Sequence, residues 1–249
     1  MATLELPLQI RMETPKIPER VDGLNWPQVR ESLSAAGFSR LGRLLTHEEC
    51  EALRALYSRA ELFRSRIEME RFRFGRGEYQ YFAYPLPALV ADLRVALYEH
   101  LAPIASEWMA ALGLTGDFPA QLEGFLKRCH ARDQKRPTPL LLRYRTGEFN
   151  RLHQDVYGDL VFPFQVIFCL SQPEQEFTGG ELLLVEQQPR AQSIGHSVRL
   201  GQGEAVVITT RYRAVKGARG HYRTNFRHGV SAVLSGERYT LGIIFHDAA

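Results

Sequence analysis

The sequence contains few cysteines, few lysines and no long apolar segment. Its 249 residues include three cysteines, Cys50, Cys129 and Cys169, and no two of them have C-x-x-C spacing. An odd number of cysteines at these distances favours neither a disulfide framework nor a cysteine zinc site, so we expect three buried thiols. Only four of the 31 basic residues are lysine. Arginine dominance of this kind can arise from codon usage, so the arginine count alone does not indicate a nucleic-acid-binding protein.

No segment approaches the roughly 20 apolar residues that a membrane helix requires. The first residues, "MATLELPLQIRMETPKIPER", are too polar and too interrupted by proline for a signal peptide. We therefore expect a cytoplasmic protein that does not associate with membranes. Its net charge of +3 permits a polyanionic partner without requiring one.

The chain is expected to form one domain over residues 26–249, after an N-terminal extension of residues 1–25. In the first part, residues 26–137, helical signals dominate and predict a mainly helical support. Predicted helices cover 26–37, a segment from Thr46, 87–113 with a break or kink at Pro103, and 119–132, and predicted strands cover 38–45 and 78–84.

From residue 138 onward, short runs rich in leucine, valine, isoleucine and phenylalanine alternate with turn residues. This pattern predicts an antiparallel sandwich or barrel in residues 138–249. The fold class is thus α+β. The predicted strands are "LLLRYR", "LVFPFQVIFCL", "GELLLVE", "EAVVITT", "HGVSAVL" and "RYTLGIIF".

A His-x-Asp pair occurs in "LHQDVYG", where His153 and Asp155 flank one residue. In an extended backbone, residues two apart project to the same side, so both side chains could bind one metal ion. A chance match is expected in a chain of this composition. His47-Glu48-Glu49 is such a match, because Thr46 and Glu49 have the spacing of a helix capping box.

A second histidine and an arginine give the pair its significance. His228 opens the predicted strand "HGVSAVL", and Arg238 begins the last predicted strand. Two imidazoles and a carboxylate form the facial triad of non-haem Fe(II) oxygenases. If the chain forms a hairpin near Gly236, the Arg238 guanidinium can bind the far carboxylate of a small diacid that chelates the metal. Thr240, two residues on, shares the face of Arg238.

These motifs resemble the core of the 2-oxoglutarate/Fe(II) dioxygenases, in particular the prolyl-hydroxylase-like branch. The resemblance covers residues 138–247 through "RYRTGEFNRLHQD", "FTGGELLLVE", "GEAVVI" and "HGVSAVLSGERYTLGIIF". It implies a double-stranded β-helix (jelly roll), with His153, Asp155 and His228 as iron ligands. It also implies that Arg238, Thr240 and Tyr144 bind 2-oxoglutarate.

More narrowly, "GRGEYQYFAYPLP" with "HGVSAVLSGERYTLGIIFHDA" resembles a bacterial oxygenase family proposed to act on damaged nucleic acid. One departure separates this chain from the alkylation-repair dioxygenases. Those enzymes carry a second arginine six residues after the first, where this sequence has Ile244.

The resemblance implies a dioxygenase that hydroxylates a C–H bond with release of succinate and carbon dioxide. Its cofactors would be Fe(II) and 2-oxoglutarate, with dioxygen as cosubstrate and ascorbate as an accessory reductant. Oxidative demethylation of damaged nucleic acid is the first substrate hypothesis. The alternatives are a protein side-chain (prolyl-type) or small-molecule hydroxylase, and a non-catalytic sensor of 2-oxoglutarate or metal.

Two stretches that mix arginines with aromatic residues bear on the substrate, residues 63–84 and 210–228. Cations for phosphates and rings for unpaired bases would give such a composition. A solvated edge strand with a loop would give it too. The sequence leaves open the primary substrate, the oligomeric state and the role of the helical part.

Overall fold

The computed structural model describes residues 14–218 and 220–249, and its strands form two antiparallel sheets. The strand order of the larger sheet is β1 (Phe38–Arg43), β11 (Glu204–Thr209), β7 (Phe164–Cys169), β14 (Val233–Ile244), β5 (Leu140–Arg145), β4 (Glu78–Phe82) and β2 (Phe63–Glu68), with β8 (Phe177–Gly179) also paired to β14. The strand order of the smaller sheet is β10 (Ile194–Val198), β9 (Leu182–Gln187), β13 (Gly220–Val230), β6 (Phe149–His153) and β3 (Gly75–Arg76), with β12 (Tyr212–Gly217) also paired to β13.

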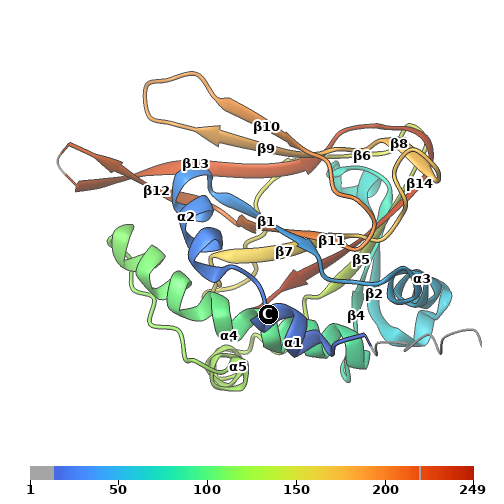
Figure 1. Cartoon of the computed structure of the whole chain (residues 1–249), viewed down its shortest axis with the longest axis horizontal. Coiled ribbons are helices and arrows are strands. Elements are labelled where there is room, and N and C mark those ends of the chain that lie inside the picture. The colour runs from blue at the N-terminus through green and yellow to red at the C-terminus, as the bar shows by residue number, and fades with distance from the viewer. Residues whose placement is uncertain (1–13, 219) are drawn as a thin grey trace, which may run out of the picture.

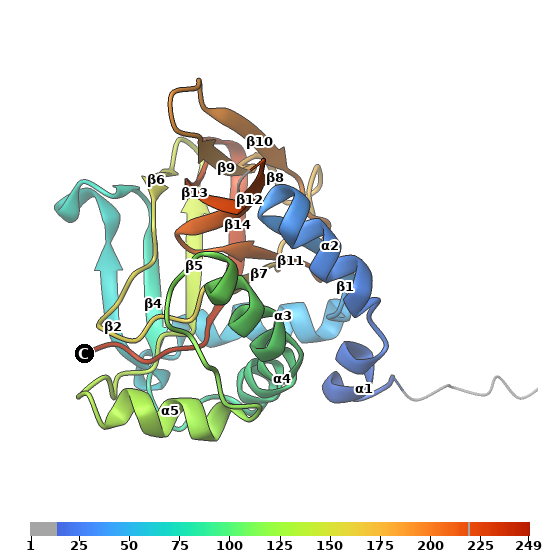
Figure 2. The same cartoon turned by 90° about the vertical axis from the view of Figure 1, so that its left-hand side faces the viewer.

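The two sheets lie one above the other, and helices cover the outer face of the larger sheet (Figure 1). This helical layer contains α1 (Ile17–Asp22), the long α4 (Ala88–Ala111) and α5 (Leu122–His130). Helix α2 (Trp26–Ala36) packs beside β1, and α3 (His47–Ala55) lies at the other end of that strand (Figures 1 and 2).

The alternation of side chains along β7 and β14 divides the apolar core into two layers. Phe164, Val166 and Phe168 of β7 pack in the cluster that faces the helices. Cys169 and Ile167 belong to the cluster between the sheets. Because successive strand residues point to opposite faces, Arg238 and Thr240 on β14 point between the sheets, opposite in direction to Leu241 and Ile243.

Most strands predicted after residue 138 are confirmed, but "HGVSAVL" is not one strand. β13 ends at Val230 and β14 begins at Val233, and these two strands belong to different sheets. The chain therefore crosses between the sheets at Ser231 and Ala232. This crossing means that no hairpin joins His228 to Arg238, so the hairpin prediction is wrong.

A mainly helical first half is not what the structure shows. The four predicted helices are present, and α4 continues through Pro103 without a break. The same part of the chain also contributes β1, β2, β3 and β4 to the sheets. Residues 63–84, expected within the helical part, form β2, the short 3₁₀ helix η3 (Met69–Phe72), β3 and β4. Periodicity missed β2 and β3 because they are short and rich in arginine.

Three further expectations concern the surface and the termini. The cysteine thiols are all buried and unpaired, as predicted. None of the helices in the described ranges is long and apolar enough to span a membrane. Of the predicted N-terminal extension, residues 1–13 lie outside the described residues, and α1 places Ile17 and Val21 in the helix-facing core.

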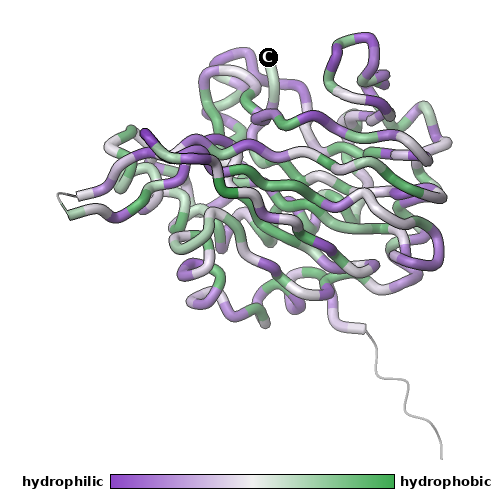
Figure 3. Tube along the Cα trace, turned by 90° about the horizontal axis from the view of Figure 1, so that it is seen from above, coloured by the Kyte–Doolittle hydropathy of each residue, from purple (hydrophilic) through white to green (hydrophobic). Residues whose placement is uncertain are grey.

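The β12–β13 hairpin projects from the body of the molecule and is mostly hydrophilic (Figure 3). It corresponds to the second arginine-rich stretch of the sequence. Seen from above, hydrophobic residues are concentrated along the central strands instead (Figure 3).

Candidate metal centre

His153, Asp155 and His228 meet at one end of the smaller sheet. His153 ends β6, and His228 lies directly opposite it on the antiparallel strand β13. The two imidazole rings have their centroids 4.2 Å apart. Asp155 follows β6, and one ligand atom from each of the three residues lies within 4.8 Å of the others. The three residues predicted as a ligand set therefore converge.

The Asp155 carboxylate lies between the two imidazoles. Its Oδ1 is 3.5 Å from Nε2 of His153, and its Oδ2 is 3.2 Å from Nε2 of His228. Burial alone would raise the pKa of Asp155, but the charges and hydrogen bonds of His228 and His153 hold that pKa well below its usual range. Burial lowers the pKa of His228 and favours its neutral form. Burial opposes protonation of His153, but the hydrogen bond and charge of Asp155 raise its pKa. A divalent transition metal that displaces this proton would bind the buried carboxylate and both imidazole nitrogens.

Groups around the ligands orient them, and none of these neighbours was predicted from the sequence. Nδ1 of His153 lies 2.7 Å from the Arg151 carbonyl oxygen, which leaves Nε2 directed at Asp155. The Tyr157 hydroxyl donates to Asp155 Oδ1 at 2.7 Å. The Gln165 amide nitrogen on β7 lies 3.2 Å from Nε2 of His228. A polar residue inside the apolar run "FQVIF" was the signal that could have identified Gln165.

Arg238 faces the same cavity from the larger sheet. Its side chain is 3% exposed, and it has no carboxylate within ion-pair distance among the described residues. Its Nη1 atom is buried without a hydrogen-bond partner there. The guanidinium lies between the rings of Tyr144 and Phe177, at 5.8 and 5.9 Å from their centroids. A buried and uncompensated cation costs several kcal/mol, so this position fits a bound anion.

Tyr144 and Thr240 lie beside Arg238. Tyr144 is the cross-strand partner of Arg238 on β5, and Thr240 is two residues further along β14. Burial raises the pKa of Tyr144, so its hydroxyl stays protonated and can donate a hydrogen bond. Thr240 is buried as well. All six residues predicted to form the site line one cavity of about 350 Å³.

Gly180 makes room for the arginine. It has a φ of +63°, and a Cβ atom there would lie 2.8 Å from Cδ of Arg238. The positive φ of Gly179 and Gly180 suits a turn, and Gly180 also permits the close approach of the Arg238 side chain.

Gln134, which follows α5, holds the segment after Asp155 in place. Its Oε1 accepts a hydrogen bond from the Leu160 amide at 2.8 Å. Gly158, with a φ of +94°, is needed here because a Cβ atom would lie 2.5 Å from the Gln134 amide carbon. The Gln134 amide nitrogen lies within hydrogen-bond distance of three carbonyls, those of Tyr157 (3.1 Å), Leu160 (2.9 Å) and Asp247 (2.7 Å).

The other His-x-acid match has a structural role, as expected. Thr46 and Glu49 form the predicted capping box at the start of α3. His47 lies 2.9 Å from the Gln202 side chain and outside the metal cavity.

Comparisons with known proteins agree with this geometry. A family model described as "Oxygenase, catalysing oxidative methylation of damaged DNA" matches residues 77–248. The uncharacterized protein Rv2227 of Mycobacterium tuberculosis (strain ATCC 25618 / H37Rv) is 52% identical over 168 residues, which cover 68% of this chain and 72% of that protein.

Solved structures share the fold at low sequence identity. A Pseudomonas putida prolyl-4-hydroxylase aligns with a TM-score of 0.54 and 19% identity, covering 90% of this chain and 99% of the other. An oxidoreductase of the 2-oxoglutarate-Fe(II) oxygenase family from Burkholderia pseudomallei aligns with a TM-score of 0.53 and 14% identity, covering 91% and 93% of the two chains.

Proposed function

The chain belongs to the oxygenase family whose model matches residues 77–248, and we propose that it uses Fe(II) and 2-oxoglutarate to oxidise a C–H bond in damaged nucleic acid. We assign the two facing sheets to the double-stranded β-helix and residues 26–249 to one oxygenase domain. The observation that carries the proposal is a buried carboxylate between two imidazoles, in the same cavity as a buried arginine that no carboxylate in residues 14–218 and 220–249 pairs with.

His153, Asp155 and His228 would hold the iron through Nε2 of each imidazole and the carboxylate. Bound together, Fe(II) and 2-oxoglutarate supply the oxidising chemistry, which hydroxylates a C–H bond with dioxygen and releases succinate and carbon dioxide. Arg151 fixes the orientation of His153 through its carbonyl, and Tyr157 orients the Asp155 carboxylate.

Arg238 would bind the far carboxylate of 2-oxoglutarate, because a guanidinium recognises a carboxylate with two parallel hydrogen bonds. Tyr144 and Thr240 would donate hydroxyl hydrogen bonds to the same cosubstrate. The apolar walls of the cavity, which include Leu142 and Ile167, exclude bulk water and so strengthen these interactions.

Damaged nucleic acid as the substrate is proposed on the family description. Oxygenase cosubstrates include no methyl donor, so the chemistry we propose is removal of a methyl group. Hydroxylation of an N-methyl carbon forms an unstable N–CH₂OH group, which loses formaldehyde and restores the N–H bond. A protein side-chain or small-molecule hydroxylase, and a non-catalytic sensor, are the competing outcomes of the test.

The test measures succinate formation by the purified protein with Fe(II) and 2-oxoglutarate in air. We expect turnover to be stimulated by a methylated single-stranded oligonucleotide, and not by a proline-containing peptide. His153→Ala and Asp155→Ala should abolish turnover, whereas His47→Ala, which changes a histidine outside the cavity, should retain it. Stimulation by the peptide alone would refute the substrate. Binding of metal and 2-oxoglutarate without any succinate would identify a sensor.

A further inference from the structure

Exposed apolar side chains gather where the metal cavity opens. Arg73, Phe74, Arg151 and Leu152 line that cavity. Phe72 stacks on Phe74, and Val156, which follows Asp155 in the chain, lines a neighbouring hollow. We call these six residues the rim. Among the described residues, four of the nine exposed large apolar side chains belong to the rim: Phe72, Phe74, Leu152 and Val156.

The two phenylalanines form a preassembled aromatic surface. Their rings are 5.5 Å apart and inclined by 20°, so they lie nearly parallel. Phe72 is 54% exposed and Phe74 is 47% exposed. Both come from the turn between β2 and β4, which projects beside β6 (Figure 2). Leaving two rings in water is unfavourable, so such a surface indicates a binding partner.

Aromatic side chains continue from this surface toward the metal ligands. Another hollow, of about 250 Å³, is lined by both phenylalanines and by Tyr79, Tyr81 and Tyr157. The same three tyrosines and Phe74 also line the metal cavity. A flat ring bound at the rim would thus lie next to an aromatic path that leads to the ligands.

The charges around the rim are positive and largely uncompensated. In the described part of the chain, six exposed arginines that line the cavity, line a neighbouring hollow or lie on β13 have no carboxylate within 4.0 Å: Arg73, Arg132, Arg151, Arg211, Arg223 and Arg227. Exposed arginines elsewhere are commonly paired, as Arg30 is with Glu107 and Arg199 with Glu174.

Four of these arginines are tied to the ligands or to a neighbouring hollow. Arg227 immediately precedes the ligand His228. The carbonyl of Arg211 accepts a hydrogen bond from Gln154, which lies between the ligands His153 and Asp155. Arg211 and Arg223 both lie over the Tyr212 ring, at 4.6 and 5.4 Å. Arg211, Tyr212 and Arg132 line an adjoining hollow of about 460 Å³, together with Trp108 and one unpaired acid, Asp159.

We propose that the rim binds single-stranded nucleic acid, with an unpaired base stacked on Phe72 and Phe74 and the flanking phosphates on Arg73 and Arg151. This inference rests on the proposed function and specifies the form of its substrate. Exposed rings and unneutralised arginines are the two groups that recognise bases and phosphates of a single strand. In a duplex the faces of the bases are covered by their neighbours. A peptide would supply rings or prolines but no regular series of phosphates.

The first test measures the affinity of the metal-free protein for a fluorescent single-stranded oligodeoxynucleotide, so that turnover plays no part. Base stacking on aromatic side chains predicts that Phe72→Ala/Phe74→Ala weakens binding by about 5- to 150-fold. Ile194→Ala, which removes an exposed apolar side chain on β10, is the matched control and should bind like wild type. Unchanged affinity in the double variant would overturn the proposal.

The second test separates charge from stacking. Arg73→Gln/Arg151→Gln should reduce the slope of log affinity against log salt by about 1.4, since each phosphate contact on a single strand contributes roughly 0.7. Arg30→Gln/Arg199→Gln removes the same net charge from paired sites and should leave the slope unchanged. The same sequence as a duplex should bind more weakly. Equal affinity for the duplex, or displacement of the oligonucleotide by a proline-rich peptide, would contradict the proposal.

Metal titration distinguishes failure of this inference from failure of the proposed function. If the wild-type protein binds metal but no oligonucleotide, the oxygenase assignment is retained and the proposal for the rim is rejected. If His153→Ala does not change metal binding, the assigned metal site is wrong and the proposed function is rejected with it. The supporting result is weakened oligonucleotide binding by Phe72→Ala/Phe74→Ala with the metal affinity of wild type, because neither phenylalanine belongs to the ligand set.

Discussion

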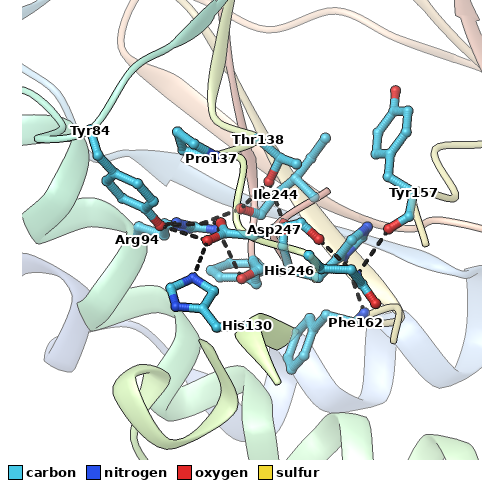
Figure 4. Close-up of polar contacts among 12 residues, drawn as sticks. Tyr84, Arg94, His130, Pro137, Thr138, Tyr157, Phe162, Ile244, His246 and Asp247 are labelled. Carbon is cyan, nitrogen blue, oxygen red and sulfur yellow. Dashed lines mark hydrogen bonds and ion pairs between the residues drawn. The ribbon is translucent and has the colours of Figure 1, made fainter. Parts of the chain in front are cut away.

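Two buried arginines in this protein should respond in opposite ways to the same substitution. Arg94 is 1% exposed, and it donates to two backbone carbonyls and to Asp247 at 2.8 Å (Figure 4). Arg238 is 3% exposed and has no such partner among the described residues. Methionine approximates the length of an arginine stem without its charge. We therefore predict the effects of Arg94→Met and Arg238→Met on the metal-free protein and on 2-oxoglutarate binding.

The expected magnitudes follow from what each substitution leaves behind. Arg94→Met removes the buried cation from Asp247 and leaves that carboxylate with Tyr84 and the partly exposed His130. Breaking a buried pair in this way costs about 3–5 kcal/mol of stability. Arg238→Met removes a charge that no carboxylate of the described residues pairs with. It also loses two cation–π contacts worth roughly 0.5–1 kcal/mol each. Removing the buried charge offsets that loss, so the stability of the unliganded protein should change little or rise.

For the affinity for 2-oxoglutarate, Arg238→Met should have the larger effect of the two substitutions. Two hydrogen bonds between a guanidinium and a carboxylate contribute about 3–5 kcal/mol together. Arg238→Met should therefore weaken the binding of 2-oxoglutarate by at least about 100-fold. The assay combines urea unfolding of the metal-free variants with anaerobic calorimetry of 2-oxoglutarate in the presence of Fe(II). At an Fe(II) concentration that saturates the site, Arg94→Met protein that remains folded should keep the wild-type affinity for 2-oxoglutarate, because Arg94 does not line the cavity. Unchanged affinity in Arg238→Met, or a destabilisation as large as that of Arg94→Met, would refute the reasoning.

Three further predictions concern the ligands, their support and acid stability. Asp155→Ala should lower Fe(II) affinity by at least about 10-fold in calorimetry, because it removes the only anionic ligand of the three; wild-type affinity would contradict the site. Gln134→Leu should weaken Fe(II) binding by about 10- to 100-fold, as loss of a supporting residue does, and urea unfolding would check that the fold persists. Burial lowers the pKa of His246 to about 4. Between about pH 6.5 and 4 the unfolded state therefore binds more protons than the folded state, and the stability of the fold falls as the pH decreases through that range. His246→Gln should lose less stability than wild type between pH 7 and 5 in urea unfolding, and an identical loss would exclude His246 as a cause.

The sequence predicted the ligand set because its order and spacing carry the information. His153 and Asp155 are local neighbours, and the resemblance to a known family placed His228 and Arg238 in the same site. The geometry between those last two residues was wrong. Alternation along a strand shows which face a side chain occupies, but it does not show to which sheet the strand belongs. The crossing at Ser231 and Ala232 therefore could not be read from the pattern "HGVSAVL".

Residues that act through backbone contacts were also missed. Gln134 has no motif, since its partners are carbonyls of residues far along the chain. The first half was expected to be mainly helical because its long helices give strong periodic signals. β2 and β3 contribute short strands whose polar residues hide the alternation.

The helical layer gains a specific role from the contacts beneath the metal site. Arg94 on α4 and His130 on α5 both bind the Asp247 carboxylate, at 2.8 Å each (Figure 4). The Asp247 carbonyl in turn lies 2.7 Å from the Gln134 amide nitrogen. Gln134 then holds the segment that follows Asp155 through its bonds to Tyr157 and Leu160. The helices thus set the position of the loop that carries the carboxylate ligand, although they contribute no ligand themselves. It follows that disrupting Arg94 should lower metal affinity even where the protein still folds.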